Sequence, residues 1–299
     1  MYLGFLTVCL GKVELPKLVK WASENGFESL EVAAWPVDSD RDYAGSTLNV
    51  AQLNQKKADE LKKVFAQNKV KISSLAFYDN NLHPDKKKRE AVHEHLYKVI
   101  DAAEMLGVDQ AGTFIGRDPN LTIEENLKEF QKVFKPHLEY AKKHKVKLII
   151  ENCPMVGWQK PELVGNIAFS PELWKQMFEL RPEENFGLNL DPSHLYWLGI
   201  NYLEATREYA SRILHTHAKD TEIISKKLGT GSIYGRGWWR YRMPGLGQID
   251  WNKWISILSE SGYNGAVSIE HEDPVWEGSE EKTKKGLFIA KRCLSNYLV

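Results

Sequence analysis

The sequence has few cysteines, no excess of either charge and no long apolar run, and each shortage excludes a class of protein. Its three cysteines, Cys9, Cys153 and Cys293, form no C-x-x-C pair, which excludes a cysteine-based zinc ribbon and fits a reducing cytoplasm. Lys plus Arg and Asp plus Glu balance at 40 each, so no net field attracts nucleic acid or an anionic membrane. No apolar run approaches the ~20 residues that span a bilayer.

The first residues, MYLGFLTVCLGKVEL, superficially look like a signal peptide. No basic segment precedes them and no small-residue cleavage site follows, so they are interpreted as a first strand. We therefore expect a cytoplasmic protein that has no membrane or nucleic-acid partner. The hydrophobic content of 42% is enough for a substantial core.

Short apolar runs alternate with longer amphipathic stretches along the whole chain. The predicted strands are residues 2–8, 29–33, 70–77, 110–114, 146–151, 186–191, 213–218 and 265–270. The predicted helices are residues 15–25, 50–69, 86–107, 121–144, 171–180, 201–210, 250–262 and 278–297. This order predicts a single α/β domain over residues 1–299, a (β/α)8 TIM barrel. A doubly wound open sheet is the alternative, but it usually carries a Gly-rich phosphate loop after the first strand, and TVCLGKVEL is not one.

Local signals support these boundaries. Ser170 precedes Pro171 as an expected N-cap, and Asp250 is expected to cap the helix that follows it. Glycines in ENGFESL and ESGYNGA lie just past a helix, where a left-handed C-cap is expected. The longest irregular segments, 34–49, 152–169 and 221–249, follow predicted strands and so fall on the C-terminal rim, where barrel enzymes keep their active sites.

Ionisable side chains gather at the ends of the last four predicted strands. Glu151, Asp191, His217 and Glu270 come from four successive strands, so they are expected to form one arc on the rim. Three carboxylates and a neutral imidazole suit one divalent cation, with Mn²⁺ as the first choice and Co²⁺, Mg²⁺ or Zn²⁺ as alternatives. Each residue alone has a structural alternative, because strand-end glutamates often cap helices and buried histidines are often only packed.

The period-two alternation of a strand separates neighbouring candidates. His215 points the same way as His217 but lies deeper, so it is expected to pack or to support the ligand. In AVSIEHEDP, Glu272 repeats the inward direction of Glu270 at the mouth, whereas His271 points toward the helices and is expected to be structural. Asp273 is expected to turn the chain toward the last helix.

The motifs IIEN, LDPSH, HTHAKD, RMPGLGQIDW and SIEHED together resemble the xylose isomerase-like TIM barrel superfamily. Within it they resemble the sugar phosphate isomerase/epimerase family, which includes ketose 3-epimerases such as D-tagatose/D-psicose 3-epimerase. The resemblance extends over nearly the whole chain. Its motifs are fairly specific for the superfamily, but they give little information about the substrate.

The resemblance implies roles for particular residues. Glu151, Asp191, His217 and Glu270 match the family's metal ligands, and the two glutamates also match its acid/base pair. One removes the proton next to the carbonyl and the other returns it on the opposite face, through a cis-enediolate. His194 matches the family's substrate-hydroxyl histidine, with a helix-start role as the alternative.

The remaining residues of the predicted substrate site come from rim segments. Arg242 matches the family arginine before the Pro-Gly turn, with Arg240 as its rival. Lys219 belongs to HAKD, Trp35 follows the second strand as a pocket wall, and Trp158 follows the fifth. The other predicted substrate-binding residue, after the third strand, is His83.

Endonuclease IV, a more distant member of the superfamily, places extra histidines near the position of His83. Here the further histidines are too few, and the balanced charge gives no DNA-tracking surface. Trp238 and Trp239 lie in an insertion of roughly 20 residues, and they either stack on a sugar ring or form an oligomer contact. Members of the superfamily often form dimers or tetramers, so a homo-oligomer is expected by resemblance, although no stripe of residues identifies the contact.

The leading functional hypothesis is a divalent-metal-dependent isomerase or epimerase of an unphosphorylated keto-sugar or related carbohydrate. The same chemistry with a leaving group on the β-carbon gives a second hypothesis, a lyase or dehydratase acting on an inosose or a 3-keto-glycoside. A non-catalytic sugar-binding barrel is the third. Product analysis separates the first two, and loss of turnover on changing the glutamates separates both from the third.

Overall fold

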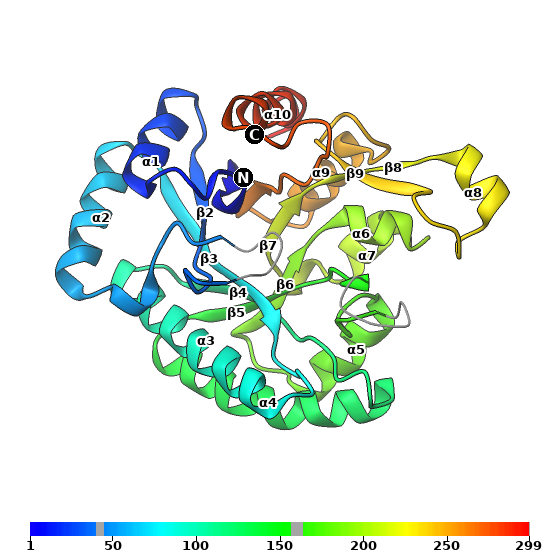
Figure 1. The fold of residues 1–299 in the computed structure, drawn as a ribbon, viewed down its shortest axis with the longest axis horizontal. Helices are drawn as coiled ribbons and strands as arrows, with labels where there is room; N and C mark the ends of the chain where they lie inside the picture. The colour runs from blue at the N-terminus through cyan, green and yellow to red at the C-terminus, as the bar shows by residue number, and fades with distance from the viewer. Residues whose placement is uncertain (40–44, 157–163, 299) are drawn as a thin grey trace.

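The computed structural model describes residues 1–39, 45–156 and 164–298, and eight parallel strands of these residues close a barrel (Figure 1). The barrel strands are β1 (Tyr2–Leu6), β2 (Ser29–Ala33), β3 (Lys71–Asn80), β4 (Gln110–Phe114), β5 (Lys147–Glu151), β6 (Phe186–Leu190), β7 (Ile213–Ala218) and β10 (Ala266–Ile269). They follow one another around the barrel in chain order, and β10 closes it against β1. The predicted TIM barrel is confirmed.

Helices cover the outside of the barrel (Figure 1). They are α1 (Leu15–Glu24), α2 (Gln55–Gln67), α3 (Lys86–Leu106), α4 (Ile123–Lys143), α5 (Pro171–Leu180), α6 (Pro192–Trp197), α7 (Tyr202–Glu208), α9 (Trp251–Glu260) and α10 (Glu280–Leu294). Each predicted helix corresponds to one of these, and α6 is an addition that the pattern did not predict. Asp250 caps α9 by accepting a hydrogen bond from the Lys253 amide at 3.1 Å. Gly26 and Gly262 have φ values of +69° and +79°, as their C-cap positions require.

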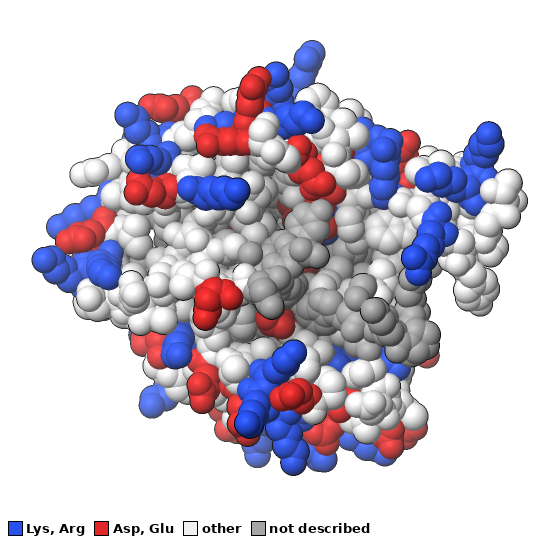
Figure 2. Space-filling model, viewed as in Figure 1, with Lys and Arg blue, Asp and Glu red and all other residues white. Residues whose placement is uncertain are grey.

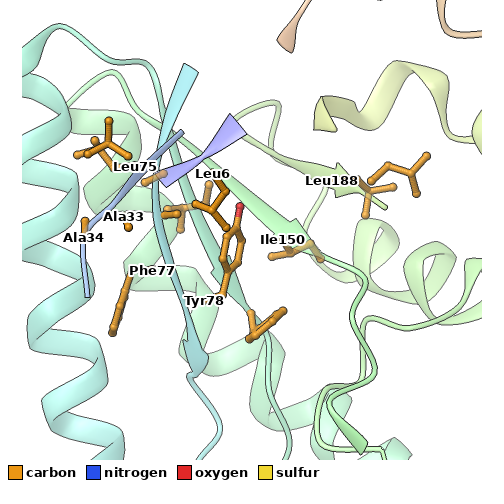
Figure 3. Close-up of a cluster of buried hydrophobic side chains, with 14 of the residues drawn as sticks. Leu6, Ala33, Ala34, Leu75, Phe77, Tyr78, Ile150 and Leu188 are labelled. Carbon is orange, nitrogen blue, oxygen red and sulfur yellow. The ribbon is translucent and has the colours of Figure 1, made fainter. Parts of the chain in front are cut away.

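The strands are buried on both sides, so their side chains alternate between the barrel interior and the helix layer. On β3, Phe77 packs its ring 4.5 Å from His95 of α3, while Tyr78 points inward and donates a hydrogen bond to Glu31 (Figure 3). Apolar residues such as Leu75 and Ile150 fill the space between the strands and the helices. The interior toward the rim is polar instead, and this is where the site lies.

Residues 221–249 are not irregular, as the sequence predicted, but form an arm. β8 (Asp220–Ile223) pairs with β9 (Trp239–Arg242) in an antiparallel ribbon, and α8 (Ser225–Gly231) follows β8. The arm extends beyond the ring of helices (Figure 1). Trp239 stacks on Trp197 of α6 with ring centroids 4.3 Å apart, so at least this tryptophan is held by an intramolecular contact.

The outer surface carries both signs of charge. Around the barrel, Lys and Arg alternate with Asp and Glu on the face seen in Figure 2. The helices of the described residues include none long and apolar enough to cross a membrane. Cys9, Cys153 and Cys293 are all free thiols.

Candidate metal and substrate site

Glu151 lies at the last position of β5, where an apolar run delivers it to the rim. Its side chain is buried, and its Oε1 lies 3.3 Å from Nε2 of His194 and 3.2 Å from Nδ1 of His217. A carboxylate is costly to bury unless it is paired, so these two contacts account for its presence at the end of a core strand.

Asp191 follows β6 and caps the short helix α6. Its Oδ1 accepts the amide hydrogen bond of Ser193 at 2.8 Å. Asn152 fixes its backbone, accepting from the Asp191 amide at 2.7 Å and donating to the Asp191 carbonyl at 2.9 Å. The other carboxylate oxygen, Oδ2, is buried and makes no hydrogen bond to any described residue, although Nε2 of His194 lies 3.2 Å away. This oxygen is free of hydrogen bonds within the described residues, has the charged neighbours His194 and Lys219, and is a candidate metal ligand.

Glu270 directly follows β10. Its Oε2 lies 3.3 Å from Nδ1 of His217 and 2.5 Å from Nζ of Lys219. Since β10 and β5 are separated by β7 and β6 in the barrel, Glu270 and Glu151 approach His217 from different strands of the rim.

Donor atoms of Glu151, Asp191, His194 and Glu270 all lie within 4.8 Å of one another, and those of Glu31, His215 and His217 form a second such group. The sequence predicted His217 as the fourth ligand, whereas the four-residue group contains His194. His217 Nδ1 nonetheless faces two of the three carboxylates. The donor set, with three carboxylates, imidazole nitrogens and a free Asp191 oxygen, fits a hard or borderline divalent cation.

Lys219 is the positive charge of the cluster. Its buried ammonium lies 2.9 Å from Glu272 and 3.4 Å from Asp191, in addition to its contact with Glu270. It also lies 4.3 Å from the centre of the Tyr241 ring. Without a metal, Lys219 therefore neutralises carboxylates that would otherwise repel one another.

Replacing Lys219 with methionine is expected to lower the free energy of unfolding of the metal-free protein by about 3–5 kcal/mol, because Glu270 and Glu272 lose their buried counter-charge. Urea unfolding in the presence of a chelator, followed by tryptophan fluorescence, measures the change. Lys226→Met on the exposed face of α8 is the control, with an expected change within about 0.5 kcal/mol. A loss equal to that of the control would contradict the counter-charge role.

The site holds its groups in defined charge states. Burial opposes the charge of Glu151, but the neighbouring His217 and two hydrogen bonds outweigh it and keep the pKa of Glu151 below its ordinary value. Burial also opposes the charge of His217, yet Glu31, Glu270 and Glu151 raise its pKa well above the ordinary value. Burial raises the pKa of Glu272, and the neighbouring Lys219 opposes that shift.

A pocket opens above the cluster. It is lined by Glu151, Lys219, Glu270 and Glu272 and by apolar and aromatic residues that include Trp35 and Tyr78. Trp35 therefore lies where the sequence placed it, and its buried indole N–H has no hydrogen-bond partner among the described residues.

Two other predicted substrate residues lie in different settings. The guanidinium of Arg242 binds Asp273 at 2.9 Å and Glu222 at 2.6 Å. The ring of His83 accepts a hydrogen bond from the Asp85 amide at 3.0 Å in the turn before α3. Trp158 lies outside the described residues. A substrate role for these three residues stays a prediction.

The sequence missed two site residues. Tyr241 of β9 contacts Nδ1 of His194 through its hydroxyl at 2.9 Å, so the arm reaches the cluster of ionisable residues. The alternation along WRYR contained this signal, since it places Tyr241 on the opposite side of the strand from Arg242. Glu31, an acidic residue inside the buried run SLEVA, lies 2.8 Å from His217 and was also visible as an anomaly.

A family model described as xylose isomerase-like TIM barrel matches residues 19–293. The chain is 27% identical to the uncharacterized protein YfiH of Bacillus subtilis, over 91% of this chain and 93% of that one. It is 26% identical to an inosose isomerase of Halalkalibacterium halodurans, over 86% and 82% of the two chains. It is 36% identical to an inosose dehydratase of Clostridium botulinum, but only over 33% and 35%.

Solved structures share the fold at lower identity. The IolI protein with a bound zinc atom has a TM-score of 0.75 at 20% identity, covering 100% of this chain and 99% of that one. A D-psicose 3-epimerase has a TM-score of 0.68 at 15% identity, covering 98% and 99%. At these identities the structural likeness shows the fold alone.

Proposed function

The chain belongs to the xylose isomerase-like TIM barrel family, and from that premise we propose that it is a metal-dependent isomerase or epimerase of an unphosphorylated polyhydroxy ketone, either a keto-sugar or an inosose. One observation carries the proposal: Glu151 and Glu270 lie 3.2 and 3.3 Å from the same ring nitrogen of His217. Two carboxylates beside one ligand atom are the parts that reversible proton transfer next to a carbonyl requires.

We propose Glu151, Asp191, His217 and Glu270 as the residues that hold the metal. The free Oδ2 of Asp191 and the inward Nδ1 of His217 support this choice. When bound, the metal supplies a Lewis acid that polarises the substrate carbonyl. A zinc atom is present in the structure of the similar IolI protein, but the choice among Mn²⁺, Co²⁺, Mg²⁺ and Zn²⁺ rests on experiment.

The two glutamates carry the proton. Glu151, whose pKa is held low, is an ionised base that removes the proton from the carbon beside the carbonyl. The C–H electron pair then forms an enediolate while Glu151 keeps the proton. Glu270, after taking up a proton from water, gives that proton to carbon and regenerates the carbonyl compound, and Glu151 releases its proton to water. Delivery to the opposite face of the same carbon inverts that carbon, and delivery to the neighbouring carbon moves the carbonyl once the hydroxyl proton has passed from one enediolate oxygen to the other. Neither outcome changes the oxidation state of the molecule as a whole.

The pocket walls bind the rest of the substrate. We propose that Trp35, which lines the pocket, and His194, whose Nε2 lies 3.3 Å from Glu151, bind hydroxyl groups of the substrate. Lys219 donates a hydrogen bond to Glu270, and its proposed role is to stabilise negative charge on a substrate oxygen. The likeness to an inosose isomerase over most of the chain supports inososes as substrates to test beside ketoses.

The test is a panel of ketohexoses, inososes and 3-keto-glucosides incubated in D₂O with Mn²⁺, Co²⁺, Mg²⁺ or Zn²⁺ and followed by NMR. We expect one substrate to give an isomer or epimer with deuterium at the reacting carbon. Recovery of every compound without deuterium, from protein that holds its metal, would overturn the proposal.

Elimination is the second candidate because Glu272 is placed for it. Burial raises the pKa of Glu272, which accepts a hydrogen bond from Lys219 at 2.9 Å, and we propose it as the residue that takes up a proton beside Glu270. A protonated Glu272 can give its proton to a departing hydroxyl, which leaves as water and produces an unsaturated ketone. The match to inosose dehydratases over a third of the chain agrees with this option. In the same panel, an unsaturated product absorbing in the ultraviolet would select elimination.

A further inference from the structure

Glu31 is a buried carboxylate that the proposed reaction does not use. It lies on β2 with 0% exposure, below the metal and substrate site. Its Oε2 is 2.8 Å from Nε2 of His217, a residue of β7. Because β2 and β7 are separated by β1 and β10 in the barrel, the pair spans the barrel interior.

Both oxygens of Glu31 are held by further donors. Tyr78 donates to Oε1 at 2.6 Å and Ser74 donates to the same oxygen at 3.2 Å. Ser268 donates to Oε2 at 2.9 Å. Figure 3 shows the Tyr78 hydroxyl directed into the barrel, away from Phe77. The carboxylate therefore has fixed partners from β3, β7 and β10 and one orientation.

A metal site is the obvious alternative, since Glu31, His215 and His217 have close donor atoms. The nitrogens of His215 argue against it. Nδ1 contacts the Asn189 side chain at 3.0 Å and Nε2 contacts the Ser73 hydroxyl at 3.0 Å, so neither is free. Replacing an apolar pair with a buried ion pair also brings little stability. The remaining role for Glu31 is to act on His217.

The two nitrogens of His217 face different groups. Nδ1 faces Glu151 and Glu270, whereas Nε2 faces Glu31 at 2.8 Å and the side-chain amide nitrogen of Asn189 at 2.9 Å. The Asn189 amide nitrogen donates to the Tyr78 hydroxyl at 2.6 Å, so the hydrogen-bond acceptor beside Nε2 is the Glu31 carboxylate. A histidine can bind a metal through Nδ1 only when that nitrogen has its lone pair and the proton lies on Nε2. A carboxylate on Nε2 selects that arrangement and fixes the ring.

We propose that Glu31 is a positioning residue that holds the proton of His217 on Nε2 and keeps Nδ1 directed at the metal. The inference rests on the proposed metal site. It adds that metal affinity depends on a β2 carboxylate that does not itself bind the metal. Loss of such a partner typically lowers metal affinity 10–100-fold.

Zinc titration of chelator-treated protein tests the inference, because it needs no substrate. Glu31→Gln is expected to weaken zinc binding about 10–100-fold relative to the natural chain. ¹⁵N NMR of histidine-labelled, zinc-loaded protein gives a second readout: the natural chain is expected to show a metal-bound Nδ1 and a protonated Nε2 at His217. Ser74→Ala is the control, because it removes the longest hydrogen bond to Glu31 and leaves the carboxylate in place. The expected change in zinc affinity of this variant is below about threefold.

Each result has one meaning. If Glu31→Gln binds zinc within threefold of the natural chain and His217 still coordinates through Nδ1, the positioning role is wrong while the proposed site stands. If the natural chain itself binds no zinc, Mn²⁺, Co²⁺ or Mg²⁺, the proposed function and the role of Glu31 fail together. Should Glu31→Gln not fold, Glu31→Asp keeps the charge but draws it away from Nε2, and unchanged zinc affinity in that variant overturns the role equally.

Discussion

Glu151→Gln and Glu270→Gln are each expected to lower kcat by about 10²–10⁴-fold on the substrate that the panel identifies. Glutamine preserves the shape of the side chain and an oxygen for the metal, but it cannot accept a proton from carbon. The two variants are expected to differ in how the substrate exchanges hydrogen for deuterium in D₂O. Glu151→Gln stops deuterium uptake at the carbon that loses its proton, whereas Glu270→Gln blocks the return of the proton.

The metal content of each variant must be measured together with its kcat, because both glutamates are also proposed metal ligands. Metal content by mass spectrometry separates loss of the ion from loss of the proton carrier. Glu14→Gln is the matched control, since its carboxylate is exposed at 71% and pairs with Lys17 on the surface. Full turnover of either variant with metal bound would exclude that glutamate from proton transfer. Full turnover of both would leave only a binding function for the pair.

The sequence predicts the barrel well because its signals are local and repeated. Each buried strand is an apolar run, each helix is amphipathic, and glycines such as Gly26 mark where one ends and the next begins. Parallel strands must end at the same rim, so Glu151, Asp191 and Glu270 were predicted to meet without knowledge of any distance. Their side chains do meet in the structure.

What the sequence could not predict depends on contacts between distant segments. The arm was interpreted as irregular because β8 and β9 are four residues each and carry charged residues, so they lack the apolar pattern of a core strand. Tyr241 enters the site only because that ribbon folds back over α6. The order of strands along the sequence also does not show which side chains meet across the barrel interior. Glu31 was therefore interpreted as part of a strand and not as a partner of His217.

The choice between His194 and His217 shows the same limit. Both were predicted near the cluster, one for substrate and one for metal, from their places in two motifs. The structure brings both within 3.3 Å of Glu151, so proximity to that carboxylate does not separate them. The partners of the second ring nitrogen do separate the two histidines. Nε2 of His217 contacts the carboxylate of Glu31, whereas Nδ1 of His194 contacts the hydroxyl of Tyr241.

A histidine that binds a metal usually donates its other N–H to a carboxylate, a carbonyl or a water, and a carboxylate raises its basicity. On this ground His217→Asn is expected to weaken metal binding by about 100-fold or more. This loss is larger than the one expected when a residue that only supports a ligand, such as Glu31, is changed. His194→Asn is expected to keep the metal within about tenfold and to lower kcat/KM about 10–100-fold, as loss of a hydrogen bond to a charged or polarised substrate oxygen would.

Calorimetric titration of both variants with Zn²⁺ and Mn²⁺, together with kcat and KM on the identified substrate, checks the two expectations. The decisive comparison is between the variants, because each removes one buried imidazole of the same cluster and leaves the three carboxylates in place. If His194→Asn lost the metal and His217→Asn kept it, the ligand set would be the four-residue group with His194. His217 and Glu31 would then form a structural pair beneath it. The opposite result joins Glu31, His217 and the three carboxylates into one site that spans the barrel from β2 to the rim.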